Sequence, residues 1–369
     1  MTDTDPQQKA AATPRTVLHI GPSGHPTGGV SRYLGQLSRL PTDRTRHHIH
    51  GKGIPKRNDF TDYLVAILSI PYQYVSCLAK SEPDILHVHT SQSRGFLLSA
   101  AYVLGFSRYW DVPVVLHAHG SQFARFVERS DGMMKRLQDE VFDTVAYTIA
   151  VSEDTADAIS ESFPDQNVVV LRHCVEIDDY EPVAERNGEV RFLFLSNLIK
   201  RKGVAELAAA VETLSDYFES GRATLTIAGK GPLSDVVHTL SESYDAVEYR
   251  GFVTEDEKRS LINEKDVFVL PTRSEAGVPI AIVEGMAGAN AIITTTVSGI
   301  PELLDENNGI LIPPKDSQSL ADAMAAMIEG TWVEEMGEEN HRLVKRRYTT
   351  KILAERLDGI YLKIERTAD

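Results

Sequence analysis

The stretch PTRSEAGVPIAIVEGMAGANAIITTTVSGIPELL, residues 271–304, places two carboxylates around an apolar run. Glu275 precedes the run and Glu284 follows it. The small residues 285–289 predict a closely packed helix that ends near Asn290, so a loop with one acid enters a helix with the other. The two acids are about two and a half helical turns apart and lie on roughly one side of this element. Both could therefore accept hydrogen bonds from an elongated polyhydroxylated ligand.

The start of the same helix offers donors of a second kind. Backbone N–H groups at a helix N-terminus are unpaired and carry a partial positive charge, so those of Gly277 and Val278 could bind phosphate oxygens. Pro279 contributes no such N–H group. Hydroxyl and phosphate recognition together indicate a nucleotide sugar. The alternative interpretation is a pair of solvated glutamates on a surface loop and helix.

Strand-like segments alternate with helical ones along most of the chain, which predicts an α/β fold with doubly wound sheets. In such sheets, ligands bind beyond the carboxyl ends of the strands. The strand-ending segments that we expect are PDILHVHT (83–90), VPVVLHAHG (112–120), TIAVSE (148–153), VRFLFLSN (190–197), ATLTIAG (223–229), VEYRGFV (247–253) and DVFVLPT (266–272).

A glycine-rich turn follows the first predicted strand. In TVLHIGPSGHPTGGVSRYLGQL, residues 16–37, a helix is expected to begin near Gly28, and Gly28 and Gly29 could cradle an anion. The turn lacks the dinucleotide spacing G-x-G-x-x-G, and a purely structural turn is the alternative.

These motifs together resemble glycosyltransferase family 4 (glycosyl transferases group 1), the retaining GT-B enzymes. The resemblance covers nearly the whole chain after residue 15. It implies two Rossmann-like doubly wound domains with the active site in the interdomain cleft, and no metal or other cofactor. In the family, seven residues separate two glutamates, whereas eight separate Glu275 from Glu284 here. Either the loop bulges at Ala276 and Gly277, or Glu275 acts from a shifted position.

The resemblance also assigns roles. It implies catalytic roles for His119, Lys202 and Glu275, and donor binding by Gly28, Gly29, Asn197, Lys202, Phe252, Val253, Gly277, Val278 and Glu284. His119 would position the sugar, Lys202 would bind the diphosphate and Glu284 would hold the ribose. For the other histidines of these strands, His87, His89 and His117, a structural role is favoured. Asn197 stands where the family usually has arginine, so Lys200 or Arg201 could supply part of the missing charge.

Composition fits a cytoplasmic enzyme with two domains. The chain has 369 residues, of which 42% are hydrophobic, and its two cysteines are too few for a disulfide framework. The net charge of −15 argues against nucleic acid as a partner. The predicted parts are a disordered tail (1–14), an acceptor-binding domain (15–180), a nucleotide-sugar-binding domain (187–350) and a C-terminal helix that crosses back to the first domain (351–369).

One segment departs from this acidic composition. Residues 39–57 carry six cations and a single aspartate: Arg39, Arg44, Arg46, Lys52, Lys56 and Arg57 against Asp43. The apolar run 63–79 that follows is interrupted by Pro71 and is too short for a confident membrane span. A basic patch beside an apolar segment suits peripheral contact with an anionic membrane at its inner face. The alternative is a basic loop followed by an ordinary buried helix.

The sequence thus predicts a retaining glycosyltransferase. It would move a hexose-type sugar from a nucleoside diphosphate sugar, with a UDP-sugar favoured over a GDP-sugar, to a hydroxyl of a glycan or lipid-linked acceptor. The process would be cell-surface polysaccharide or glycoconjugate synthesis. Two alternatives stay open: a non-catalytic nucleotide-sugar-binding subunit, and a GT-B enzyme of another class such as a sugar-nucleotide epimerase.

Overall fold

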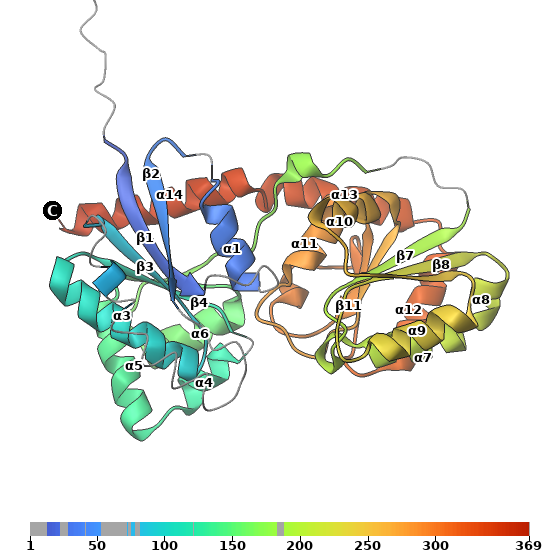
Figure 1. Cartoon of the computed structure of the whole chain (residues 1–369), viewed down its shortest axis with the longest axis horizontal. Coiled ribbons are helices and arrows are strands. Elements are labelled where there is room, and N and C mark those ends of the chain that lie inside the picture. The colour runs from blue at the N-terminus through green and yellow to red at the C-terminus, as the bar shows by residue number, and fades with distance from the viewer. Residues whose placement is uncertain are drawn as a thin grey trace, which may run out of the picture. The chain divides into compact units, whose positions relative to one another are not determined.

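The computed structural model describes residues 13–22, 29–40, 42–52, 72, 75–77, 82–120, 122–182 and 188–368. These residues form two six-stranded sheets with flanking helices, in two compact units (Figure 1). The first unit comprises Met1–His117, Asp131–Thr148 and Ala354–Asp369, and the second comprises Ala118–Ser130 and Ile149–Leu353. The predicted α/β class with doubly wound sheets is confirmed.

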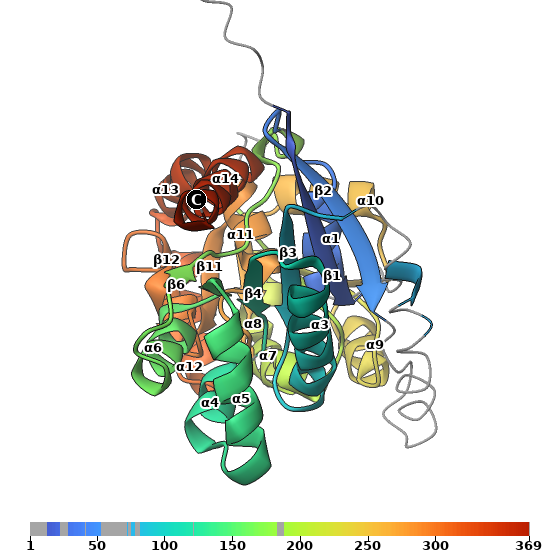
Figure 2. The ribbon, with the colours of Figure 1, turned by 90° about the vertical axis from the view of Figure 1, so that its left-hand side faces the viewer.

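The first sheet has the strand order β2-β1-β3-β4-β5-β6. Its strands are β1 (Arg15–Pro22), β2 (Thr45–Lys52), β3 (Ile85–Thr90), β4 (Val114–Ala118), β5 (Tyr147–Ala150) and β6 (Val168–Val170). Figure 2 shows β2, β1 and β3 side by side, and β1 pairs in parallel with both neighbours. Every residue of β3 and β4 is buried, as expected for strands of a parallel sheet that helices cover on both faces.

The described helices of residues 29–179 are α1 (Gly29–Leu37), α3 (Arg94–Trp110), α4 (Phe123–Arg129), α5 (Gly132–Thr144), α6 (Glu153–Ser162) and the short η1 (Ile177–Asp179). Helix α1 begins where the sequence predicts, one residue after Gly28, which itself lies outside the described residues. The last helix is α14 (Thr350–Ala368), and its residues from Ala354 onward belong to the first unit. Asp358 accepts hydrogen bonds from Thr42 and Thr45, and Arg15 pairs with Glu365 at 3.3 Å.

The second sheet has the order β12-β11-β10-β7-β8-β9, and all its neighbours pair in parallel. Its strands are β7 (Val190–Leu195), β8 (Ala223–Ala228), β9 (Val247–Gly251), β10 (Val267–Leu270), β11 (Ala291–Thr295) and β12 (Gly309–Ile312). Its helices are η2 (Lys200–Lys202), α7 (Val204–Thr213), α8 (Ser215–Glu219), α9 (Ser234–Ser243), α10 (Glu255–Glu264), α11 (Ile280–Ala287), η3 (Ile300–Glu302), α12 (Ser317–Glu329) and α13 (Val333–Arg347). In Figure 1, α10, α11 and α13 lie on one face of this sheet and α7, α8, α9 and α12 on the other.

Helix α11 is the closely packed helix predicted from the small residues after Glu284. A Cβ atom at Gly285 would lie 2.8 Å from the ring of Phe268 on β10, and one at Gly288 would lie 2.3 Å from the side chain of Ile262 on α10. Only glycine allows the helix backbone to approach the sheet and α10 this closely. The small residues therefore fix the position of α11, and with it the position of Glu284.

Candidate active site

The second sheet has a topological switch point between β7 and β10. From β7 the chain proceeds to β8 and β9 on one side, and then crosses back to place β10 on the other side of β7. At such a point the loops beyond the two central strands diverge and leave room for a ligand. The loop after β7 contains Lys202, and the loop after β10 contains Glu275.

These two loops are joined by a buried ion pair. The Lys202 Nζ atom lies 2.5 Å from Glu275 Oε1, and both side chains are almost fully buried. Arg201 donates to the other carboxylate oxygen of Glu275 at 2.9 Å, and the Thr272 hydroxyl donates to Oε1 at 2.6 Å. Lys200 is exposed. Asn197 stands where the family usually has arginine, and Lys200 or Arg201 could supply the charge instead. Of these two, Arg201 contacts Glu275 in the site.

Burial has an electrostatic consequence for this pair. It lowers the pKa of the Lys202 ammonium, and the negative charge of Glu275 partly opposes the effect. The neighbouring guanidinium of Arg201 lowers the pKa of Lys202 further. A site with two cations and one carboxylate is suited to receive an additional anion, because that anion would stabilise both positive charges.

The loop between the two acids has an unusual backbone conformation at Gly277. This glycine has a φ of +64°, a left-handed conformation that other residues rarely adopt. A Cβ atom here would lie 2.6 Å from the carbonyl oxygen of Val151, and the Gly277 N–H donates to the Ser298 hydroxyl at 3.0 Å. The irregular loop leaves the Glu275 carboxylate directed at Lys202. Whether this carboxylate also reaches a bound sugar stays a prediction.

The remaining predicted donor residues of the second unit follow β7, β10 and β9. Asn197 follows β7 and is exposed, and Val278 is buried near the end of the loop that joins β10 to α11. Phe252 follows β9 and is 59% exposed, with the Lys230 ammonium 5.3 Å from its ring centroid. Val253 beside it is half-buried. An exposed aromatic ring at a strand end could stack on a nucleobase.

His119 follows β4 and is buried, with its ring centroid 6.1 Å from that of His173. Burial lowers the pKa of His173 to about 4, so that residue is neutral at physiological pH. The sequence analysis did not identify His173, because a single histidine after a short strand carries no distinctive spacing. In the first unit, Gly29 is the first residue of α1.

Glu284 has a buried partner that the sequence analysis also missed. The Lys258 Nζ atom lies 2.6 Å from Glu284 Oε1, and the two side chains are 5% and 6% exposed. A second ion pair joins Arg273 to Glu206 at 2.5 Å.

A cavity of about 1200 Å³ lies elsewhere in this unit, between residues 301–311 and α13. None of the side chains Lys258, Glu284, Arg273 and Glu206 lines it.

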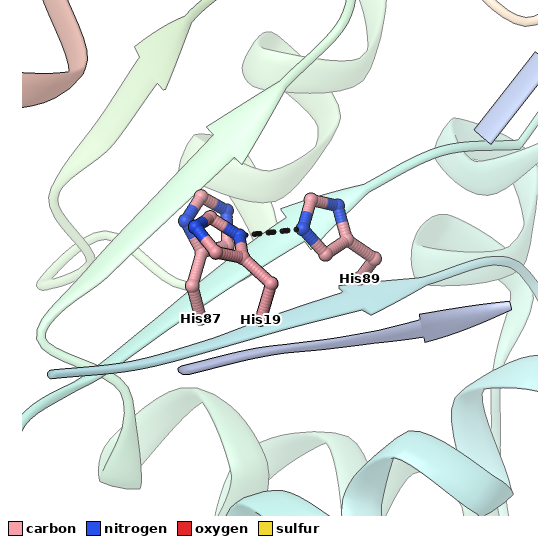
Figure 3. Close-up of side chains that lie close together, drawn as sticks. All are labelled: His19, His87 and His89. Carbon is pink, nitrogen blue, oxygen red and sulfur yellow. Dashed lines mark hydrogen bonds between the residues drawn. The ribbon is translucent and has the colours of Figure 1, made fainter. Parts of the chain in front are cut away.

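Histidines gather in the first unit around β1 and β3 (Figure 3). His19 Nδ1 lies 3.1 Å from His89 Nε2, and His19 Nε2 lies 2.9 Å from His47 Nδ1. His87 Nδ1 lies 2.7 Å from the Tyr361 hydroxyl. Burial lowers the pKa of His87 to about 3 and that of His47 to about 4, and it holds the pKa of His19 well below 6.5.

This histidine cluster could be considered a metal site, since one nitrogen from each of His19, His87 and His89 lies within 4.8 Å of the others. Three neutral imidazoles are a ligand set that zinc accepts. However, His87 uses one nitrogen toward Tyr361 and the other toward His117, at 3.3 Å. We therefore interpret the cluster as a hydrogen-bonded network of neutral rings. The prediction that no metal is required stays untested.

Comparison with known proteins places both halves of the chain in one family. Residues 27–179 match the family described as Glycosyltransferase Family 4, and residues 189–330 match the family described as Glycosyl transferases group 1. The chain belongs to the family 4 glycosyltransferases. The predicted family is thereby confirmed, and glycosyltransferase activity follows from it.

Relatives of this glycosyltransferase include a Bacillus subtilis (strain 168) protein that is named as a teichuronic acid biosynthesis glycosyltransferase, TuaC. The two are 27% identical over 299 residues, which are 78% of this chain and 72% of TuaC. The phosphatidyl-myo-inositol mannosyltransferase of Mycobacterium tuberculosis is 22% identical over 365 residues, which are 90% and 93% of the two chains. The amylovoran biosynthesis glycosyltransferase AmsK of Erwinia amylovora is 31% identical, but only over 38% of this chain and 36% of AmsK.

Solved structures show that the glycosyltransferase has the GT-B fold. A sucrose-phosphate synthase from Thermosynechococcus elongatus superimposes with a TM-score of 0.74 at 16% identity, over 96% of this chain and 100% of that chain. The Anabaena protein Alr3699/HepE, in a complex with UDP, superimposes with a TM-score of 0.72 at 15% identity, over 94% and 100%. Among the described residues, no helix has the length and apolar character needed to cross a membrane.

Proposed function

We propose that this enzyme transfers a hexose-type sugar from a nucleoside diphosphate sugar to a hydroxyl of a glycan or lipid-linked acceptor, with retention of the donor's α configuration. A UDP-sugar is the favoured donor and a GDP-sugar the second choice. Cell-surface polysaccharide or glycoconjugate synthesis is the proposed process. The names of TuaC and AmsK, and the UDP and UDP-glucose bound in the Alr3699/HepE structures, support this proposal.

The observation that carries the proposal is the Lys202–Glu275 ion pair at the switch point of the second sheet. Departure of a nucleoside diphosphate leaves negative charge on the leaving group and positive charge on the sugar. A cation and an anion held in contact at one place match these two developing charges. In the proposed complex, Lys202 moves its hydrogen bond from Glu275 to the diphosphate, and Glu275 faces the sugar.

The other residues complete the proposed binding of the donor. Glu284 accepts hydrogen bonds from the ribose hydroxyls, and the N–H group of Val278 binds a phosphate oxygen. The N–H group of Gly277 binds a second one by exchanging its hydrogen bond from the Ser298 hydroxyl to the phosphate. Phe252 and Val253 contact the base, and Asn197 donates a neutral hydrogen bond near the phosphates. His119 positions the sugar. No step in this scheme requires a metal ion or a further cofactor.

A basic surface on the first unit supports the proposal of a lipid-linked acceptor. Arg39, Arg44 and Arg46 are exposed there. Lys56, Arg57 and most of the apolar run 63–79 lie outside the described residues. Exposed cations attract anionic lipid headgroups, so the enzyme would bind at a membrane surface that holds a lipid-linked acceptor.

A direct test incubates the purified enzyme with radiolabelled UDP- and GDP-sugars and with lipid extracts as acceptors. Transfer of label to a lipid or glycan, with the α-anomeric product, is the expected result. Release of free sugar or epimerised nucleotide without transfer would contradict it in favour of an epimerase-like enzyme. Donor binding without hydrolysis and without transfer to any acceptor would instead indicate a non-catalytic binding subunit.

A further inference from the structure

We propose that Lys258 is a positioning residue for the donor: it holds the Glu284 carboxylate in place, so that this carboxylate can accept hydrogen bonds from the ribose hydroxyls. This inference rests on the proposed function, because it assumes that a nucleotide binds at Glu284. It adds a residue whose role the family resemblance does not imply.

Lys258 is itself held in a fixed place. It lies in the first turn of α10, which begins with a capping box: the Thr254 hydroxyl accepts from the Glu257 N–H, and the Glu257 carboxylate accepts from the Thr254 N–H at 2.7 Å. Such reciprocal hydrogen bonds define where a helix begins. The Lys258 side chain is 5% exposed, which is unusual for lysine and requires a charged partner.

The partners of Lys258 lie on two sides. Its Nζ atom contacts Glu284 Oε1 at 2.6 Å on the buried side and Glu255 Oε2 at 2.5 Å on the solvent side, where Glu255 is 58% exposed. Since the Glu284 side chain is 6% exposed, its charge would be costly without a cation at this distance. The Lys258 ammonium offsets this cost, and the ion pair fixes the position of the Glu284 carboxylate.

The ion pair leaves capacity for a ligand. An ionised carboxylate has two oxygens with about four lone-pair sites, so one ammonium contact at Oε1 does not prevent further hydrogen bonds. The backbone beneath Glu284 is fixed as well, because Gly285 packs directly on Phe268 of β10. Lys258 thus fixes the carboxylate of Glu284, and the packing of Gly285 fixes its backbone. Such a preorganised acceptor suits a ligand with two neighbouring hydroxyls, as on a ribose.

A structural role is the competing explanation, in which the pair merely joins α10 to α11. The two explanations differ in their dependence on the ribose hydroxyls. We would measure the affinities of UDP and of 2′,3′-dideoxy-UDP by calorimetry, for the wild type, Lys258→Met, Glu284→Gln and Glu255→Gln. The ratio of the two affinities reports the hydroxyl contacts alone, because the base and the diphosphate are the same in both ligands.

The wild type should prefer UDP by about tenfold or more, as expected for hydrogen bonds to a charged group. Lys258→Met should reduce this ratio at least about fivefold while changing the affinity for the dideoxy compound little. Glu255→Gln, which alters the solvent-side partner of the same ammonium, should leave the ratio unchanged. A folded Lys258→Met variant with the wild-type ratio would overturn the proposal.

The double variant Lys258→Met/Glu284→Gln covers the case in which Lys258→Met alone does not fold. It removes both charges together and so avoids an unpaired buried carboxylate. Its UDP affinity should equal that of Glu284→Gln, because Lys258 acts through Glu284. A further loss would show that Lys258 acts by another route and would overturn the proposal. If the wild type binds neither UDP nor GDP, the donor class itself is wrong, an outcome distinct from an unchanged ratio.

Discussion

The two units bury polar side chains in different ways. In the first, His19, His87 and His89 are buried and His47 is half-buried, and their ring nitrogens contact one another or Tyr361. Burial lowers the pKa of His19, His47 and His87. In the second, charged side chains lie in the interior as close ion pairs, among them Lys202–Glu275. A neutral network satisfies its own hydrogen bonds, whereas a charged pair can exchange one partner for a charged ligand. This difference agrees with the proposal that the second unit binds the anionic donor.

Removing the central cation of the charged cluster (Arg201, Lys202 and Glu275), or the histidine proposed to act with it, should have the largest effect. Lys202→Ala removes the cation proposed to bind the leaving diphosphate, and His119→Ala removes the group proposed to position the sugar. Each should lower kcat/KM by about 100-fold or more, as is usual for a key electrostatic contact. Steady-state transfer assays, with circular dichroism as a check on folding, measure this. Near-normal turnover in both variants would show that the site has been assigned wrongly.

The neutral cluster should respond to acid. The pKa of His87 is lowered to about 3 in the folded protein, against 6.5 when it is exposed. Below pH 6.5 His87 therefore binds a proton in the unfolded chain but stays unprotonated in the folded chain. Its contribution to the unfolding free energy is fully present above pH 6.5 and is lost as the pH falls toward 3. At pH 5 this amounts to about 2 kcal/mol for such a group.

Urea unfolding between pH 7.5 and pH 5 measures that loss. The variant His87→Gln is the matched control, since it keeps a polar side chain that does not titrate. Its unfolding free energy should fall less steeply over the same interval. A wild type whose stability is constant from pH 7.5 to pH 5 would contradict the account of neutral buried rings.

Within the second unit, Glu284 and Glu275 should affect the kinetics in different ways. Glu284 is proposed to bind the ribose equally in the ground and transition states, so Glu284→Gln should chiefly raise the donor KM. Glu275 is proposed to act where the sugar gains positive charge, so Glu275→Gln should chiefly lower kcat. We expect KM to rise about tenfold in the first variant and kcat to fall about tenfold in the second. Equal and small effects of Glu275→Gln on both parameters would mean that the extra loop residue has removed it from the catalytic step.

The basic residues of the segment 39–57 should give the smallest effect per residue. Each basic residue near an anionic bilayer contributes about 1 kcal/mol, and salt screens the attraction. Changing Lys52, Lys56 and Arg57 to serine should therefore weaken co-sedimentation with anionic vesicles at low salt. The same charge removal should leave transfer to a soluble acceptor unaffected. Vesicle binding that does not change in this triple variant would remove the basis for the proposed membrane contact.

Local patterns predicted the fold because they depend on near neighbours. Strand segments that end in polar or small residues identified the carboxyl edge of each sheet, and Gly285 with Gly288 identified α11 as a closely packed helix. The position of Gly277 could also be anticipated, since an extra loop residue requires a conformation that glycine adopts readily.

The pairings inside the site could not be predicted, because they join segments that are distant along the chain. Lys258 precedes Glu284 by 26 positions and lies on another helix. Nothing in the local sequence distinguishes Lys258 from a solvated lysine at a helix start. For the same reason the sequence left open whether Lys200 or Arg201 enters the site, and only the three-dimensional arrangement places Arg201 against Glu275.

The central claim is that the charged cluster of the second unit, and not the neutral cluster of the first, binds the diphosphate of the donor. Calorimetric titration of UDP into the wild type, Lys202→Ala and His87→Gln tests it most directly. The account predicts that Lys202→Ala weakens UDP binding by about tenfold or more, the effect of losing a charge-assisted contact, while His87→Gln binds UDP like the wild type. Unchanged affinity in Lys202→Ala, or an equal loss in both variants, would contradict it.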